Sequence, residues 1–144
     1  MNILYQFPRK GKKKEIKPKI VFVLDSSGSC YSDNILKAYF NELHDIYKEL
    51  KVEFLVIVCD MQINQTFTYK EKLKYTAKEL MGGGGTSFVP PFEYLEKHKI
   101  HPDGLIYLTD LEGPFPNKPK YPVLWVSLVK GNKAPFGKTI YLDV

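Results

Sequence analysis

A ten-residue stretch, from Ile20 to Ser29, places the strongest constraint on how this chain folds. Its first five residues are Ile-Val-Phe-Val-Leu, and residues 25–29 read Asp-Ser-Ser-Gly-Ser. An apolar run that ends abruptly in polar residues is typical of a buried strand. In open α/β sheets, ligands bind just beyond the carboxyl ends of the strands. The stretch therefore predicts a central strand that presents the side-chain oxygens of Asp25, Ser27 and Ser29 at a binding site.

The remaining elements predict an α/β fold, a doubly wound and mostly parallel sheet with helices on both faces. Apolar residues recur at helical spacing from Leu36 to Leu50, after a candidate N-cap at Ser32. Two further helices are expected, from Lys70 to Met81 and from Pro90 to about Lys99. Strands are expected at Lys19 to Leu24, Val52 to Cys59, Gln62 to Tyr69, Leu105 to Thr109, Pro122 to Leu128 and Thr139 to Leu142. The alternating pattern of residues 62–69 places that strand antiparallel at an edge.

The positive charge of the chain belongs to its beginning. The net charge is +5, but residues 1–19 hold seven basic residues and one acidic residue, which leaves the remainder close to neutral. We interpret residues 1–18 as a basic N-terminal arm or linker and residues 19–144 as one domain. A solvated linker is favoured over a nucleic-acid contact, because no pattern of stacking aromatic residues accompanies the charge.

Two further properties bear on where the protein works. The apolar runs are all too short to span a membrane, so no membrane partner is expected. The two cysteines, Cys30 and Cys59, are expected to be free thiols in a reducing, cytoplasmic compartment.

Two segments far along the chain complete a candidate metal site. Thr86 follows four consecutive glycines, and Asp110 follows a later buried strand. Each segment also has a plainer interpretation when taken alone. Residues 25–29 could be a helix-capping turn, the four glycines a flexible loop, and Asp110 a turn residue. If the strands are neighbours, two carboxylates and three hydroxyls converge: Asp25, Ser27, Ser29, Thr86 and Asp110. Such hard oxygen donors suit Mg²⁺, Mn²⁺ or Ca²⁺ rather than Zn²⁺ or Cu²⁺. Asp60, Ser87 and Glu112 are candidates for a partner-binding rim around this site.

The pattern Asp25-x-Ser27-x-Ser29, then Thr86, then Asp110 resembles the metal-ion-dependent adhesion site (MIDAS) of von Willebrand factor A (VWA) domains. Over residues 18–144 the chain also resembles a narrower group, the VWA-like domain at the C-terminus of a family of predicted bacterial metallopeptidases. The stretches that carry this second resemblance are Val23-Leu24-Asp25-Ser26-Ser27-Gly28-Ser29, Cys59-Asp60, Gly82-Gly83-Gly84-Gly85-Thr86, Tyr107-Leu108-Thr109-Asp110, Tyr121-Pro122-Val123-Leu124-Trp125 and Ala134-Pro135-Phe136-Gly137.

The resemblance implies a sheet in the order 3-2-1-4-5-6 with strand three antiparallel at the edge. It implies metal contacts from Ser27, Ser29 and Thr86, with Asp25 and Asp110 bound directly or through water. Ser87 departs from the narrower group, in which an acidic residue is expected there. The chain contains no His-Glu-x-x-His, so the peptidase activity of the group is not expected.

These observations predict a non-enzymatic, divalent-cation-dependent protein-binding module. Its metal would take a final ligand from an Asp or Glu of a protein partner, and the resemblance suggests a partner from an AAA+ ATPase system. One alternative is a metal-dependent phosphohydrolase with Asp25 as nucleophile, although Ser27 stands where such enzymes carry a second carboxylate. The other is a structural domain with a vestigial metal site.

Overall fold

The structure is a computed structural model that describes residues 18–30, 32–70 and 82–143. Within them, the elements in chain order are β1 (Ile20–Asp25), α1 (Asp33–Leu50), β2 (Phe54–Cys59), β3 (Ile63–Tyr69), α2 (Val89–Lys97), β4 (Gly104–Thr109), β5 (Val123–Ser127) and β6 (Lys138–Tyr141). Apart from Pro18 and Lys70, the predicted basic arm and the helix predicted from Lys70 to Met81 lie outside the described residues. Neither described helix combines the length and the apolar character needed to cross a membrane.

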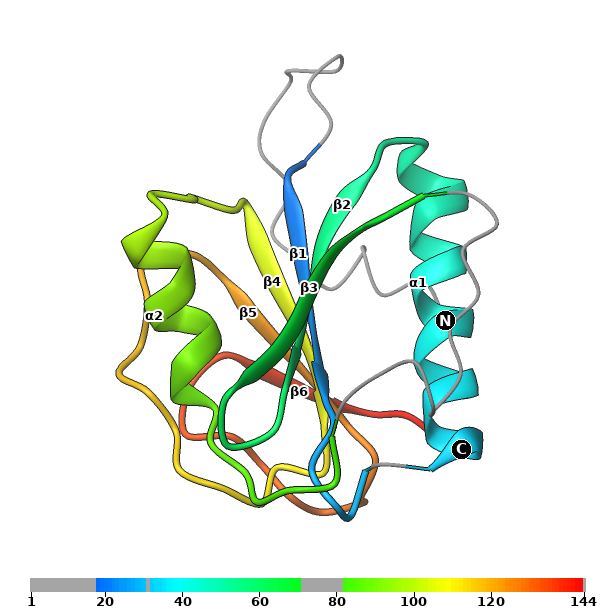
Figure 1. The fold of residues 1–144 in the computed structure, drawn as a ribbon, viewed down its shortest axis with the longest axis vertical. Coiled ribbons are helices and arrows are strands. Elements are labelled where there is room, and N and C mark those ends of the chain that lie inside the picture. The colour runs from blue at the N-terminus through cyan, green and yellow to red at the C-terminus, as the bar shows by residue number, and fades with distance from the viewer. Residues whose placement is uncertain (1–17, 31, 71–81, 144) are drawn as a thin grey trace.

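The strands form one sheet in the order β3-β2-β1-β4-β5-β6 (Figure 1). All neighbouring pairs are parallel except β2 and β3, so the predicted antiparallel edge strand is confirmed. Strand β1 lies between β2 and β4, with Asp25 opposite Cys59 and Leu24 opposite Leu108. Since parallel strands end at the same edge of a sheet, this register brings the segments after β1, β2 and β4 together.

One face of the sheet is covered by α1 (Figure 1). Phe22 and Leu24 of β1 point to this face and join a core with Tyr39 and Leu43 of the helix. The helix begins where the Ser32 side chain accepts a hydrogen bond from the Ile35 amide at 3.3 Å, as the sequence predicts. The α1 segment therefore forms because a capped, amphipathic stretch has a hydrophobic sheet face to cover.

The opposite face is covered by α2, and its core is rich in aromatic residues. Val21 and Val23 alternate with the residues that face α1, as a period of two requires. They pack in the same core as Phe88, whose ring meets the rings of Tyr107 and Trp125 edge-on at centroid distances of 5.3 and 5.5 Å. Helices on both faces confirm the doubly wound architecture.

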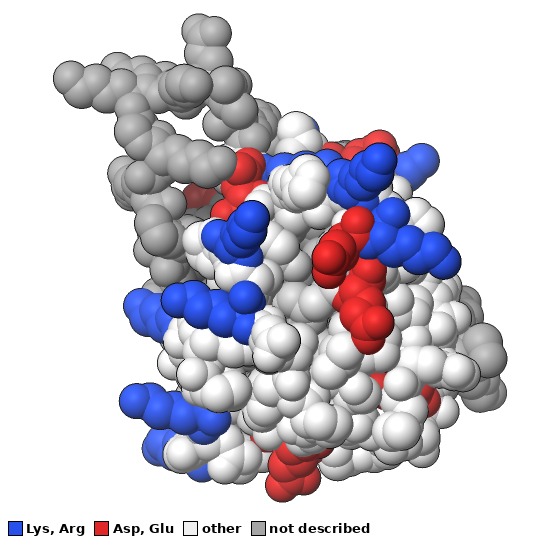
Figure 2. Space-filling model, turned by 90° about the vertical axis from the view of Figure 1, so that its left-hand side faces the viewer, with Lys and Arg blue, Asp and Glu red and all other residues white. Residues whose placement is uncertain are grey.

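Helix α2 ends at Lys97, earlier than the end near Lys99 that the sequence predicts. Lys99 has a left-handed backbone, with φ of 54°, and the Ile100 amide donates to the Leu95 carbonyl at 2.9 Å. Such a reversal satisfies the last carbonyls and stops the helix. Figure 2 shows the α2 side of the molecule, where basic and acidic side chains both lie among uncharged residues.

Candidate metal centre

Asp25 is a fully buried carboxylate at the carboxyl end of β1. Its Oδ1 accepts a hydrogen bond from the Ser27 amide at 2.8 Å, and its Oδ2 accepts one from the Thr109 hydroxyl at 2.5 Å. Burial raises the pKa of Asp25, the interactions with Ser27 and Thr109 oppose the shift, and the nearby Asp110 charge adds to it. The two donors therefore hold in place a carboxylate that its surroundings otherwise disfavour in the charged form.

Asp110 follows β4 and meets the β1–α1 loop. Its Oδ2 accepts a hydrogen bond from the Ser29 hydroxyl at 2.5 Å, and its Oδ1 accepts one from the Glu112 amide at 3.1 Å. Residues 81 positions apart in the chain are thus joined directly. The predicted convergence of Asp25, Ser29 and Asp110 at one edge of the sheet is observed.

Ser27 is almost fully buried, and its hydroxyl oxygen has no hydrogen-bond partner in the described part of the chain. Buried polar atoms are nearly always paired, so an orphan of this kind calls for an explanation. Neither Asp25 nor Asp110 forms an ion pair with a described Lys, Arg or His. Two unpaired buried carboxylates and an unpartnered hydroxyl make up a donor set that fits a hard divalent cation.

Cys30 belongs to the same cluster, although the sequence analysis did not place it there. Its Sγ and a carboxylate oxygen each of Asp25 and Asp110 all lie within 4.8 Å of one another. Burial, together with the charges of the two carboxylates, raises the pKa of Cys30 to about 12. Its position directly after Ser29 is the sequence feature that could have revealed it.

Thr109 is the second residue that the sequence analysis missed as part of the site. It was assigned only to the end of a strand, yet its hydroxyl is buried and donates to Asp25. The same Oγ1 accepts a hydrogen bond from the Leu111 amide at 3.1 Å, which holds the turn into the Asp110 loop. Its position directly before Asp110 is the sequence feature that could have indicated a role for Thr109 in the site.

The four glycines lie against the β1–α1 loop because the two backbones pair. The Gly83 amide donates to the Ser26 carbonyl at 2.7 Å, and the Gly28 amide donates to the Gly84 carbonyl at 2.9 Å. A Cβ atom on Gly82 would lie 2.4 Å from the Ser26 oxygen, a distance that only a shift of the backbone could relieve. Glycine is therefore required at position 82 for close approach.

Thr86 follows this loop and is half-buried. Its methyl group lies beside Gly113, where an added Cβ would be 2.7 Å away, so the residue packs next to the segment that carries Asp110. The loop thus brings Thr86 to the Asp110 side of the site.

The three predicted rim residues lie in different surroundings. The Asp60 carboxylate is buried and accepts hydrogen bonds from the amides of Gln62 and Gly84, both at 3.2 Å, so it holds the glycine loop. The Ser87 hydroxyl accepts a hydrogen bond from the Val89 amide at 3.3 Å, at the start of α2. Glu112 is exposed next to the Asp110 turn. Of the three, only Glu112 is an exposed residue.

Comparison with known proteins places this arrangement in a family. The chain belongs to the family described as a VWA-like domain (DUF2201), whose model matches residues 20–143. An uncharacterized protein of Thermotoga maritima is 28% identical over 100 residues, which make up 69% of this chain and 24% of that protein. The aligned part of the chain thus spans about a quarter of that relative's length. No solved structure matches the chain. The family match concerns the VWA-like domain, and the resemblance to metallopeptidases stays a prediction.

Proposed function

We propose that this domain is a divalent-cation-dependent protein-binding module with a MIDAS-type site. The observation that carries the proposal is the unpartnered Ser27 hydroxyl, which is buried two residues after Asp25, a buried carboxylate with no cationic side chain paired to it in the described part of the chain. Without a cation, the site would hold a buried Ser27 hydroxyl with no partner and two buried carboxylates, Asp25 and Asp110, with no positive charge beside them. A bound cation compensates all of them at once.

The ligands would come from Asp25, Ser27, Ser29, Thr86 and Asp110, with Mg²⁺ as the first candidate and Mn²⁺ or Ca²⁺ as alternatives. A cation held by these residues would supply an electrophilic centre for an incoming oxygen ligand. Because three of these five groups are neutral hydroxyls, they neutralise little of its charge. We propose that the remaining coordination position is completed by an Asp or Glu of a protein partner. The expectation that this partner comes from an AAA+ ATPase system, and that both act in the cytoplasm, is part of the same proposal.

The surroundings of Asp25 support binding over the phosphohydrolase alternative. A nucleophile must reach its substrate, but both Asp25 carboxylate oxygens are engaged, by the Ser27 amide and by Thr109, and the residue is fully buried. The acid–base position two residues later holds Ser27, which titrates far outside the useful range. A binding role needs neither property.

Thermal unfolding with and without metal tests the proposal. A cation at 100 times its Kd stabilises the folded state by about 2.7 kcal/mol. In a domain of this size that corresponds to a rise in Tm of roughly 5–10 °C. Ser27→Ala is expected to lose most of that rise. Ser32→Ala is the matched control, because it removes a nearby hydroxyl that caps α1 and has no place among the ligands. It is expected to lower Tm in both conditions and to keep the full metal-dependent rise.

The absence of any stabilisation of the wild type by millimolar Mg²⁺, Mn²⁺ or Ca²⁺ would overturn the proposal. An equal metal response in the wild type and in Ser27→Ala would also contradict it. Turnover of an aryl phosphate with Mg²⁺ that disappears in Asp25→Asn would favour the enzyme alternative instead.

A further inference from the structure

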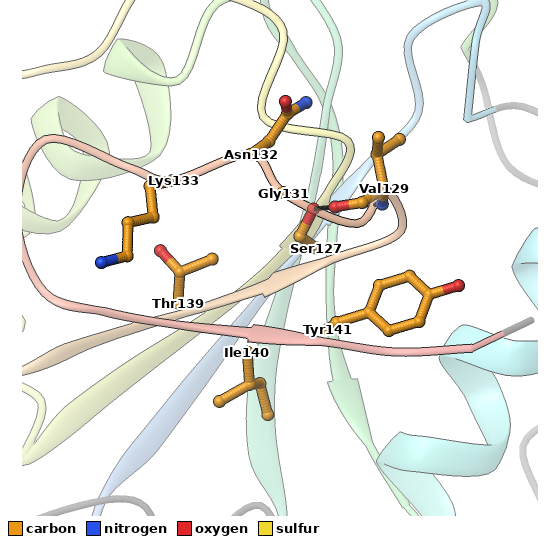
Figure 3. Close-up of a pocket in the computed structure, with 8 residues that line it drawn as sticks. All are labelled: Ser127, Val129, Gly131, Asn132, Lys133, Thr139, Ile140 and Tyr141. Atoms are coloured by element: carbon orange, nitrogen blue, oxygen red, sulfur yellow. Dashed lines mark hydrogen bonds between the residues drawn. The ribbon is translucent and has the colours of Figure 1, made fainter.

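A pocket of about 230 Å³ lies between the end of β5, the loop that follows it, and the neighbouring parallel strand β6 (Figure 3). Its walls are formed mainly by Ser127, Val129, Asn132, Lys133, Thr139 and Tyr141. Thr139 and Tyr141 point to the same side of β6, as alternate residues of a strand do. Small-molecule pockets usually measure roughly 300–1,000 Å³, so this space suits one or two side chains better than a cofactor.

The pocket combines apolar and basic groups. Four large hydrophobic residues are exposed in the described part of the chain, and two of them, Val129 at 41% and Tyr141 at 40%, line this pocket. Lys133 is exposed on the opposite wall. Lys130 lies with its Nζ 5.7 Å from the centre of the Tyr141 ring. An acidic residue also lies at this end, Asp143, which accepts a hydrogen bond from the Tyr141 hydroxyl at 3.4 Å.

The pocket is connected to the metal centre by direct hydrogen bonds. The Asn132 side chain donates to the Asp110 carbonyl at 3.1 Å, and the Leu128 amide donates to the Thr109 carbonyl at 2.9 Å. Both contacts tie the loop that forms the pocket wall to residues of the candidate metal site. A ligand that reaches the cation at Asp110 therefore has this pocket beside it.

We propose that the pocket binds the residues that flank the metal-bound carboxylate in the partner protein, and that those residues are aliphatic and acidic. This inference rests on the proposed function. An aliphatic side chain fits against Val129 and Tyr141, and a second carboxylate is attracted by Lys130 and Lys133. Apolar contact supplies affinity, and the lysines select acidic over neutral sequences.

The probe for this proposal is a synthetic peptide, acetyl-Glu-Leu-Asp-Leu-Glu-amide, titrated into the ¹⁵N-labelled 144-residue chain in Mg²⁺ and in EDTA. The matched ligand control, called the neutral peptide, is acetyl-Gln-Leu-Asp-Leu-Gln-amide, which keeps the central Asp for the metal and has neutral residues at the flanking positions. With the acidic peptide and Mg²⁺, we expect amide shifts at Val129, Lys133 and Thr139. The neutral peptide is expected to bind at least fivefold more weakly.

The double variant Lys130→Glu and Lys133→Glu is expected to weaken the acidic peptide at least tenfold and to leave the Mg²⁺-dependent rise in Tm unchanged. Lys97→Glu is the matched variant. It changes an exposed lysine at the end of α2. The chain runs from there into the start of β4, so Lys97 lies near the amino ends of the parallel strands, away from the pocket at their carboxyl ends. Its peptide affinity is expected to stay within twofold of the wild type.

Each outcome bears separately on the pocket and on the metal site. Equal affinity for both peptides, or shifts that avoid the pocket, would overturn the inference while a metal-dependent rise in Tm still upheld the proposed function. Pocket shifts of the same size in EDTA and in Mg²⁺ would support the pocket and count against metal-dependent binding. An unchanged affinity in the double variant would also overturn the inference.

Discussion

Replacing Thr109 by Val tests how the protein holds its buried carboxylate. Valine keeps the β-branched shape that suits a strand and leaves no cavity, so the change removes little besides the hydroxyl. Two hydrogen bonds disappear with it, the one donated to Asp25 at 2.5 Å and the one accepted from the Leu111 amide at 3.1 Å.

The cost follows from what each partner loses. A hydrogen bond to a charged group contributes roughly 1.5–3 kcal/mol, and a buried donor left unsatisfied costs about 1–3 kcal/mol. Because Thr109 is fully buried, water cannot replace the hydroxyl without a rearrangement. We therefore expect Thr109→Val to lower the free energy of unfolding by about 2–4 kcal/mol. Thr109→Ser keeps the hydroxyl and loses one methyl group, at a cost of about 1 kcal/mol.

The effect should depend on pH in a defined direction. The pKa of Asp25 is raised above its usual 3.8, so the folded state binds this proton more tightly than the unfolded chain does. Its contribution to stability is therefore present at low pH and is lost as pH rises from 3.8 through the raised pKa. The Thr109 hydroxyl favours the charged form of Asp25, so its removal raises the pKa of Asp25 further. The loss of stability in Thr109→Val should therefore be greatest at pH values above the raised pKa, where Asp25 is charged.

Urea unfolding in EDTA, at pH 7 and again near pH 4, measures these quantities. A loss below about 0.5 kcal/mol in Thr109→Val at pH 7 would refute the reasoning, since it falls short of any hydrogen bond to a charged group. An equal loss in Thr109→Ser would refute it as well, because that variant keeps the hydroxyl.

The remaining predictions concern the glycine loop and the thiols. Gly82→Ala should cost about 1–3 kcal/mol, because its Cβ would lie 2.4 Å from the Ser26 oxygen. Gly28→Ala, whose Cβ would meet its nearest neighbour at an ordinary 3.4 Å, should cost less in the same urea experiment, and the reverse order would contradict the loop packing. Burial raises the pKa of Cys59 to about 12, so in Cys30→Ser the remaining thiol should react with a disulfide reagent at pH 8 far more slowly than in urea. Equal rates would mean that the thiol is not buried.

The sequence was a good guide to elements and to their order along the chain. The apolar run of β1 and the helical spacing from Leu36 to Leu50 are local patterns, and each is confirmed. Element ends were less predictable, because they depend on single backbone conformations. Lys99 is an example, since its left-handed backbone near the end of α2 could not be deduced from a residue type that usually continues a helix.

The residues of the candidate site also fall into those that the sequence indicated and those whose role it could not show. Asp25, Ser27, Ser29 and Asp110 were found from position alone, because each follows a predicted strand. Asp60 was expected at an acidic rim, but its carboxylate lies within hydrogen-bonding distance of the glycine loop. The sequence could not separate these two roles, since both require an acidic residue after a strand.

By itself, the sequence determined the α/β class, the central strand and the oxygen-rich character of its carboxyl end. These follow from side-chain periodicity and from residue type, which are properties of short segments. Only the tertiary structure decided that Thr109 holds Asp25, that Cys30 lies among the carboxylates, and that the β5–β6 connection forms a pocket tied to Asp110. Those contacts depend on strand register and on loops packing across the sheet edge, and no local pattern specifies which distant residues will meet there.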